Sequence, residues 1–213
     1  YSYAKKHNVP FKQTGKIIYG LDTDKNELLS LLENGKKNGV EELSFLTNDK
    51  IRELEPNLNP EIAYGILSPH TGIVDVPAFI ESLAGQFEEN GGLISKNSTF
   101  TGYKRMNDKH YSQIKTGVEA FEIQSKILII AGGLNSYEIG KLISPLQSSK
   151  HLKKINLTKG HYFKISGLQP FSRLIYPLPG SHGLGIHYTL DIAGSVKFGP
   201  DVEYVDYEDY SVD

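Results

Sequence analysis

The segment Lys126–Ser136 combines residue types that can hold an anionic cofactor. Residues 127–131 are all apolar and three of them are β-branched, which predicts a strand buried on both faces. Gly132 and Gly133 follow at once, so the chain can turn there and bare backbone can approach a ligand. Ser136 is a good N-cap for a helix beginning at the next residue, and helix N-termini attract anions. Ordinary strand-to-helix turns give the same pattern, so both interpretations stay open.

A second group of reactive residue types lies in the C-terminal third of the chain. In the run Gly-Ile-His-Tyr-Thr, alternation places His187 and Thr189 on one face of a strand. Histidine titrates near neutral pH and can act as a general base, or it can simply hydrogen-bond within a sheet. Arg173 can pair bidentately with a carboxylate or lie on the surface of its strand. Tyr162 and Tyr176 can donate hydroxyl hydrogen bonds to a ligand or serve as packing aromatics.

Several familiar motifs are absent from the sequence. It has no G-x-G-x-x-G, no G-x-x-x-x-G-K-[ST] and no H-E-x-x-H. None of the seven histidines forms an i, i+4 pair on a recognisable helix, so we predict no metal site. His70 precedes Thr71 and Gly72 in a turn, and it is a weaker candidate for a substrate contact than His187.

Composition limits the classes of function. A length of 213 residues suits one large domain or two small ones, and the net charge of −2 gives no basic field for nucleic acid. The longest apolar run is too short to span a bilayer. The absence of cysteine excludes disulfides and thiolate ligands and is compatible with a reducing compartment. We therefore expect a cytoplasmic protein without a transmembrane segment, with peripheral attachment to the inner membrane left open.

Local signals in the first half predict alternating strands and helices. Strands are predicted at 16–20 and 63–68. One helix is capped by Thr23, carries leucines at helical spacing and stops near Gly39; a second is capped by Thr47 and ends before Pro56. Asp75 should cap a third helix, whose apolar positions form a face that packs on a sheet and whose end is Asn90–Gly92. Those apolar positions are Phe79, Ile80, Leu83, Ala84 and Phe87.

The rest of the chain predicts mostly strands. Residues 93–123 suggest an antiparallel meander with a turn at 106–109, and a helix should run from about 137 to 143, followed by a linker at 145–150. Further strands are predicted at 161–166, 173–176, 184–189 and 195–198. The fold class is therefore α+β with α/β elements. We expect domain segments at 1–74, 75–150 and 151–213, with the first and last sharing a mixed or antiparallel sheet.

Several segments, in a fixed order across nearly the whole chain, are similar to a known family. They are Val9–Lys16 with Glu53–Pro56, Leu67–Asp75, Lys159–Phe163, Ile175–Pro179, Leu184–Thr189 and Phe198–Asp201. Together they resemble the FAD-dependent oxidoreductases of the D-amino-acid oxidase superfamily, most closely the L-2-hydroxyglutarate oxidase/dehydrogenase group. The segment Ala131–Ser136 is also similar to the late cofactor-facing strand end of that family.

This resemblance implies FAD as cofactor and the oxidation of a small 2-hydroxy acid such as L-2-hydroxyglutarate, with hydride transfer to the flavin. His187 would take the hydroxyl proton of the substrate. Substrate contacts would come from Arg173, Tyr176, Thr189, Tyr162 and His70, and cofactor contacts from Gly132, Gly133, Leu134, Asn135, Ser136, Gly199 and Pro200. The 1–74 and 151–213 segments would form the substrate domain, and residues 75–150 the middle part of the FAD domain.

The sequence departs from the family at one point, since members begin with a strand and a G-x-G-x-x-G turn that grips the FAD pyrophosphate. We therefore expect an incomplete fragment that is inactive alone, with a companion chain supplying the missing FAD-binding N-terminus. Three alternatives remain. They are an FAD-dependent glycerol-3-phosphate dehydrogenase, an amino-acid oxidase of the same superfamily, and a non-catalytic remnant or split subunit.

Overall fold

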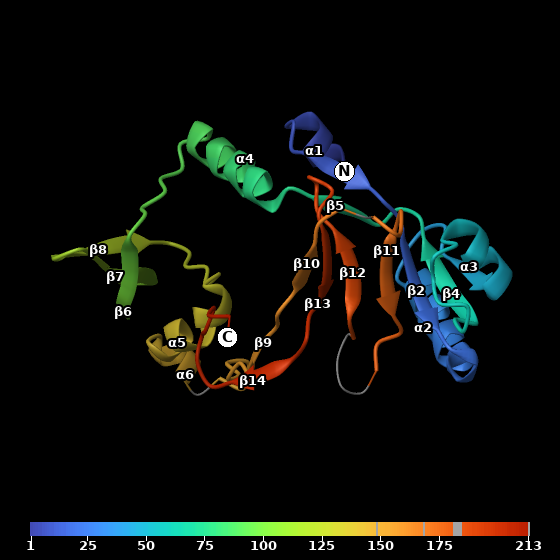
Figure 1. The fold of residues 1–213 in the computed structure, drawn as a ribbon. Coiled ribbons are helices and arrows are strands. Elements are labelled where there is room, and N and C mark those ends of the chain that lie inside the picture. The colour runs from blue at the N-terminus through green and yellow to red at the C-terminus, as the bar shows by residue number, and fades with distance from the viewer. Residues whose placement is uncertain (148, 168, 181–184, 213) are drawn as a thin grey trace. The chain divides into compact units, whose positions relative to one another are not determined.

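The computed structural model describes residues 1–147, 149–167, 169–180 and 185–212. The chain forms two compact units, one made of residues 1–87 and 158–213 and the other of residues 88–157 (Figure 1). Among the described residues, every helix is too short or too polar to cross a membrane.

The first unit is built on a seven-stranded mixed sheet with the strand order β10-β13-β12-β11-β2-β4-β3. The parallel pair β11–β2 joins strands from opposite ends of the chain, and all other pairs are antiparallel. Residues before 75 and after 150 therefore share one sheet. The strands are β2 (Lys16–Gly20), β3 (Ser44–Thr47), β4 (Tyr64–Ser68), β10 (Phe163–Ile165), β11 (Leu174–Pro177), β12 (His187–Leu190) and β13 (Val196–Gly199).

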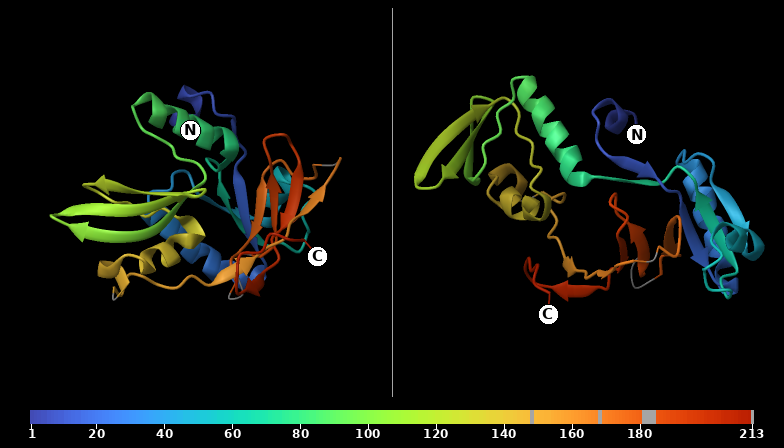
Figure 2. Two further views of the ribbon diagram at one scale, coloured as in Figure 1. Left: turned by 90° about the vertical axis from the view of Figure 1, so that its left-hand side faces the viewer. Right: turned by 45° about the horizontal axis from the view of Figure 1, so that its top comes forward.

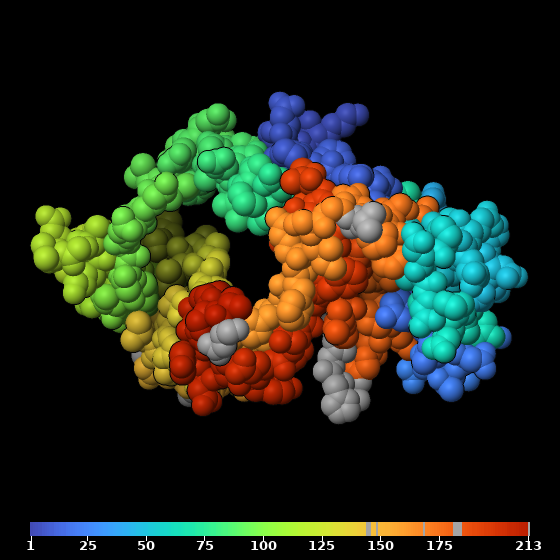
Figure 3. All heavy atoms as spheres, in the orientation of Figure 1, coloured from blue at the N-terminus to red at the C-terminus, as the bar shows by residue number. Residues whose placement is uncertain are grey.

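Two helices cover opposite faces of this sheet. Helix α2 (Lys25–Lys37) packs Leu28 and Leu32 on Ile66 of β4. Helix α3 (Asn48–Leu54) packs Ile51 on the other face, where it joins a larger cluster that includes Ile17. The space-filling view shows these N-terminal residues, blue to cyan, packed against orange and red C-terminal residues of the same unit (Figure 3).

The predicted helix starts are confirmed to within a few residues. α3 follows Thr47 and ends two residues before Pro56, as the sequence predicts. α2 begins at Lys25 after the short 3-10 helix η1 (Asp22–Asp24), so Asp24 rather than Thr23 occupies its N-cap. The Asp24 carboxylate instead accepts the Leu21 N–H at 2.8 Å, which explains the earlier turn.

Helix α4 (Val76–Glu89) begins as predicted but does not pack as predicted. The Asp75 carboxylate accepts the Ala78 N–H at 3.0 Å, a regular N-cap. However, none of its residues is buried, and Ile80 and Phe87 are 60% and 52% exposed. The prediction that this face packs on a sheet is wrong for the part of the chain that the structure describes, because no described strand covers it.

Several short elements of the first unit had no sequence prediction. These are α1 (Ser2–Lys6), β1 (Phe11–Gln13) paired with β5 (Gly72–Val74), and β9 (Leu157–Lys159) paired with β14 (Glu203–Val205). Each of these strands has three residues, which is too short for an alternating pattern to stand out.

The second unit contains the predicted meander. Strands β6 (Ser98–Met106), β7 (Lys109–Thr116) and β8 (Glu119–Ser125) form a three-stranded antiparallel sheet, seen side by side in Figure 2. Asn107 and Asp108 both have positive φ, as a two-residue hairpin turn requires. The meander and its turn are confirmed.

The segment after the meander differs from its prediction. Residues 127–131 form no strand, and Ile127 and Ile129 are 75% and 80% exposed. A strand needs a hydrogen-bonding neighbour, and no described strand pairs with this run. The short 3-10 helix η2 (Gly133–Asn135) follows, then α5 (Ser136–Lys141), so Asn135 rather than Ser136 caps it, and α6 (Ser144–Gln147) replaces part of the predicted linker.

Candidate functional site

The register of the large sheet brings His187, Tyr176 and Gly199 onto one face. Ile175 of β11 pairs with Tyr188 of β12, so Tyr176 lies level with His187. His187 in turn pairs with Gly199 of β13. Since paired residues of neighbouring strands share a face, these three residues form a row across three adjacent strands.

The same face also carries the side chains of Lys16, Ser68 and Thr189. Lys16 lies two residues before Ile18, the partner of Tyr176, and Lys16 itself pairs with Ser68 of β4. Thr189 lies two residues after His187, as the alternation in the sequence predicts. We call Lys16, Ser68, Tyr176, His187, Thr189 and Gly199 the polar face. Helix α2 covers the adjoining apolar half of this sheet face, around Ile18 and Ile66.

His187 and Tyr176 form a stacked pair at the centre of the polar face. Their ring centroids are 3.8 Å apart with an interplanar angle of 5°, and His187 is only 6% exposed. Burial, with a smaller contribution from the nearby Tyr162 phenol, raises the pKa of Tyr176, so its hydroxyl stays protonated at neutral pH. Stacking against Tyr176 restricts rotation of the imidazole.

Tyr162 and Gly199 lie against each other at the edge of this pair. A Cβ atom on Gly199 would come within 2.5 Å of the His161 carbonyl oxygen and 2.9 Å of Tyr162 Cδ1, so only glycine fits. The peptide between Gly199 and Pro200 is cis. The Asp201 carboxylate accepts the His161 N–H at 2.6 Å and lies 3.0 Å from its ring Nδ1, which fixes the neighbouring backbone of Tyr162.

The remaining predicted substrate residues occupy other surroundings. Thr189 donates its hydroxyl to the Lys197 carbonyl at 3.4 Å. His70 lies in an exposed turn, with Nδ1 2.9 Å from Gln13 Nε2 and Nε2 3.2 Å from Glu42 Oε2. Its contacts are those of a surface residue.

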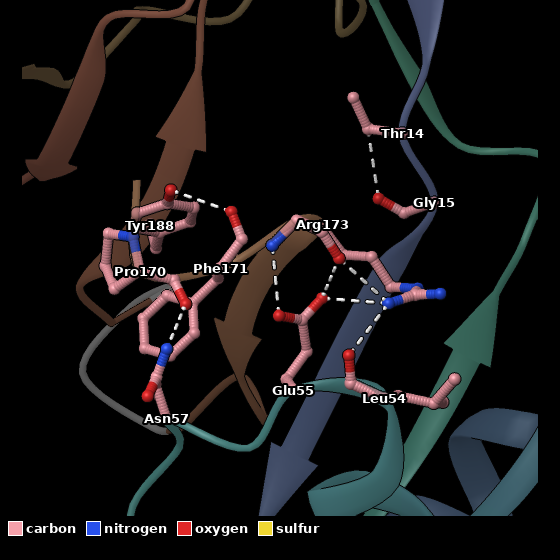
Figure 4. A network of polar contacts seen from close by, with 10 residues as sticks. Thr14, Gly15, Leu54, Glu55, Asn57, Pro170, Phe171, Arg173 and Tyr188 are labelled. Carbon is pink, nitrogen blue, oxygen red and sulfur yellow. Dashed lines mark hydrogen bonds and ion pairs between the residues drawn. The ribbon is translucent and has the colours of Figure 1, made fainter. Parts of the chain in front are cut away.

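Arg173 takes part in a buried ion pair. Its Nη1 donates to Glu55 Oε1 at 2.9 Å and to the Leu54 carbonyl at 3.1 Å (Figure 4). Glu55 is 2% exposed and also accepts the N–H and hydroxyl of Ser172 at 3.0 and 2.6 Å. A carboxylate this deeply buried requires a cation, so these contacts support a structural role for Arg173. Its role as a substrate ligand stays a prediction.

The predicted cofactor residues of the second unit lie on η2 and the start of α5. A Cβ on Gly132 would come within 2.5 Å of Ile139 Cδ1, so packing against α5 explains that glycine. Gly133 has a φ of +56° and open space around its missing Cβ, and bare backbone of this kind can accept the close approach of a ligand. The neighbouring predicted residues are Leu134, which is 47% exposed, Asn135, whose N–H donates to the Gly132 carbonyl at 3.0 Å, and Ser136.

Sequence reasoning missed Lys16, Ser68 and Glu55. Lys16 is half-buried, burial lowers its pKa, and its Nζ lies 5.3 Å from the centroid of the Tyr176 ring. The local sequence shows only that Lys16 begins an apolar strand. Its neighbours on the polar face come from strands that are distant in the sequence, so local sequence does not indicate them. Within the described residues, no group of His, Asp or Glu gathers to hold a metal ion.

Comparisons with known proteins agree on one family. The family model described as FAD dependent oxidoreductase (DAO) matches residues 2–213. L-2-hydroxyglutarate dehydrogenase of Indibacter alkaliphilus is 31% identical over 206 residues, covering 93% of this chain and 49% of that protein. The mitochondrial L-2-hydroxyglutarate dehydrogenase of Arabidopsis thaliana is 29% identical over 239 residues, covering 98% and 49%. The chain thus spans about half the length of the curated relatives it matches.

Solved structures support the fold. L-proline dehydrogenase from P. horikoshii superimposes with a TM-score of 0.78 at 16% identity, over 96% of this chain and 53% of that one. Reduced L-alpha-glycerophosphate oxidase from Mycoplasma pneumoniae with FAD bound gives a TM-score of 0.77 at 21% identity, over 93% and 52%. At these identities the likeness concerns the mixed α/β architecture.

Proposed function

Because the chain belongs to the family of FAD-dependent oxidoreductases, we propose that its polar face binds a small 2-hydroxy acid for oxidation to the 2-oxo acid, with L-2-hydroxyglutarate the leading substrate. The observation that carries this proposal is the buried, stacked pair of His187 and Tyr176 on a sheet face that also holds a cation, Lys16. FAD is the cofactor of the family and, when bound, accepts the hydride.

Each residue at or beside the polar face has a separate role around the reacting carbon of the substrate. His187 takes the hydroxyl proton of the substrate while the hydrogen on the same carbon leaves with its electron pair. Tyr176, whose hydroxyl is protonated at neutral pH, donates a hydrogen bond, and its ring limits the motion of the imidazole. Tyr162 lies beside Gly199 at the edge of the face, where its hydroxyl can donate a hydrogen bond to the substrate.

The predicted FAD contacts fit a flavin cofactor in part. The open backbone at Gly133 leaves room for a ligand, and Gly199 and Pro200 adjoin the row of His187. The chain contains no G-x-G-x-x-G, so we propose that a companion chain provides the pyrophosphate-binding segment. The exposed apolar residues of α4 and 127–131 support that proposal, because they offer surface for another polypeptide to cover.

The test is flavin reduction under anaerobic conditions. The chain is supplied with FAD, alone and together with the half of the Indibacter alkaliphilus relative that this chain does not match. We expect L-2-hydroxyglutarate, but not its D enantiomer, to bleach the flavin absorbance. We expect His187→Asn to slow bleaching by at least about 100-fold, as loss of a general base does. Circular dichroism checks that this variant folds.

Other outcomes decide between the alternatives. Bleaching by glycerol 3-phosphate, and not by 2-hydroxy acids, would favour a glycerol-3-phosphate dehydrogenase. Bleaching by an amino acid alone would favour an amino-acid oxidase. A glycerophosphate oxidase and a glycine oxidase both have folds similar to that of this chain. No bleaching by any of them would favour a non-catalytic remnant. A cytoplasmic location stays part of the proposal, with peripheral attachment to the inner membrane left open. Fractionation of cells expressing the chain tests both.

A further inference from the structure

Lys16 is the one cation of the polar face that lies next to the stacked aromatic pair. It is the first residue of β2, between Ser68 on β4 and Leu174 on β11. Its Nζ lies over the Tyr176 ring, whose other neighbour is the His187 ring at 3.8 Å. Because β11 lies between β2 and β12, the strand that carries Tyr176 separates Lys16 from His187.

In the part of the chain that the structure describes, the ammonium group of Lys16 has no counter-ion. Among the described residues, no carboxylate lies within ion-pair distance of it, and the ring of Tyr176 is its only recorded partner. The titratable groups that share the face are Tyr176, neutral at pH 7, and His187. Lys197 pairs with Thr189 further along the sheet and adds positive charge. A half-buried cation in this setting costs free energy that a bound anion would offset.

Arg173 does not fill the role of anion receptor as readily. Its Nη1 is held by Glu55 and by the Leu54 carbonyl, and Glu55 is almost fully buried. The Glu55 carboxylate already balances the charge of Arg173, so a substrate anion would gain less from Arg173 than from a cation without a carboxylate partner. Lys16 has no carboxylate partner among the described residues.

The spacing between Lys16 and His187 indicates which carboxylate is bound. Strands lie about 4.8 Å apart, so β2 and β12 are separated by about 10 Å, and the lysine side chain shortens that gap by extending over Tyr176. The carboxylate attached to the reacting carbon would stay beside His187. A carboxylate at the far end of the molecule would lie nearer Lys16.

We propose that Lys16 binds the distal carboxylate of the substrate, so that the polar face selects 2-hydroxydicarboxylates over 2-hydroxymonocarboxylates. This inference rests on the proposed function, because it takes the polar face as the substrate site. It replaces Arg173 by Lys16 as the specificity-determining cation.

The experiment measures ligand binding by the full 213-residue chain, so it does not depend on turnover. Isothermal titration compares glutarate, L-2-hydroxyglutarate, L-lactate and glycerol 3-phosphate for the wild type, Lys16→Met, Lys16→Arg and the control Lys12→Met. Lys12 is an exposed lysine on β1, four residues earlier. We expect Lys16→Met to weaken glutarate binding by at least about tenfold, the loss typical of a hydrogen bond to a charged group. Lys16→Arg should retain most of the affinity and Lys12→Met all of it.

A second measurement follows the charge of Lys16 itself. In the wild type, NMR of ¹³C-methylated lysines should give Lys16 a pKa below its ordinary value of 10.5, because of burial. Saturating glutarate should raise that pKa, since a bound anion favours the charged form. L-lactate should raise it less.

The outcomes separate this inference from the proposed function. Wild-type binding of L-2-hydroxyglutarate that Lys16→Met leaves unchanged would overturn the role of Lys16 and leave the proposed function standing. Equal binding of L-lactate and L-2-hydroxyglutarate would overturn selection for dicarboxylates. If the wild type binds glycerol 3-phosphate more tightly than glutarate, and Lys16→Met loses that binding, Lys16 binds a phosphate rather than a carboxylate. A wild type that binds none of these anions would overturn both proposals.

Discussion

Strand β2 and the segment 127–131 are both short isoleucine-rich runs, yet the molecule treats them in opposite ways. Ile17 of β2 is fully buried, with a strand on each side and α3 packed on its face, whereas Ile129 is 80% exposed. The two runs carry similar local signals for a buried strand. The difference shows that an apolar run makes burial possible, and that it becomes a buried strand only where neighbouring strands pair with it.

The ion pair between Glu55 and Arg173 joins the two sequence halves of the first unit. Replacing Glu55 by Ala should destabilise the unit by about 3 kcal/mol or more, because it leaves the partly buried Arg173 guanidinium and the Ser172 N–H without their acceptor. Urea denaturation followed by circular dichroism gives the change. Glu61→Ala is the control, since Glu61 is exposed and its side chain makes no recorded contact. Equal stability of the two variants would mean that the network in Figure 4 does not hold the halves together.

The comparison between the two isoleucine-rich runs can be tested by removing one methylene group from an isoleucine in each run. Ile17→Val should lower the free energy of unfolding by about 1 kcal/mol, since it opens space in a packed cluster. Ile129→Val should change it by less than about 0.5 kcal/mol, as for an exposed position. Thermal and urea unfolding of both variants check this. If a companion chain covers 127–131, the Ile129 variant should become as costly as the Ile17 variant once that chain is bound.

The sequence predicts the elements whose signals are local. The start of α3 after Thr47, the N-cap of α4 at Asp75 and the hairpin turn at Asn107–Asp108 each follow from a few adjacent residues. The same holds for the alternation that places His187 and Thr189 on one face. These parts need no knowledge of the rest of the chain.

The sequence predicts that the two ends of the chain share a sheet, but it does not reveal which of their strands are neighbours or in which register they pair. Lys16 reaches Tyr176 only because β2 pairs in parallel with β11, a register that links residues about 160 positions apart. Arg173 likewise meets Glu55 from a distant part of the chain, a structural contact that no local signal indicates. Its role as a substrate ligand stays a prediction. For α4 and residues 127–131 the error is the reverse. Their apolar patterns predict burial against neighbouring strands, but the described residues provide no strand that covers them.

The smallest predicted effect concerns Lys16, the polar counterpart of buried Ile17 on the same strand. Burial lowers its pKa from the ordinary value of 10.5, so the folded state disfavours the charged form. Between that lowered pKa and 10.5 the unfolded state binds more protons, and stability therefore rises with pH in this window. At lower pH both states hold the proton, and the cost of the half-buried charge is fully present.

The wild type should accordingly gain stability relative to Lys16→Met as pH rises from the lowered pKa of Lys16 towards 10.5, and Lys12→Met should show no such trend. Tyrosines whose pKa is raised by burial, such as Tyr19, titrate in all three proteins and cancel from the differences. Urea unfolding at a series of pH values provides the measurement. Saturating glutarate should flatten the trend, because an anion held by Lys16 removes the penalty for its charge. A pH-independent difference between wild type and Lys16→Met would mean that Lys16 is solvated, and that β2 presents a surface lysine rather than an anion receptor.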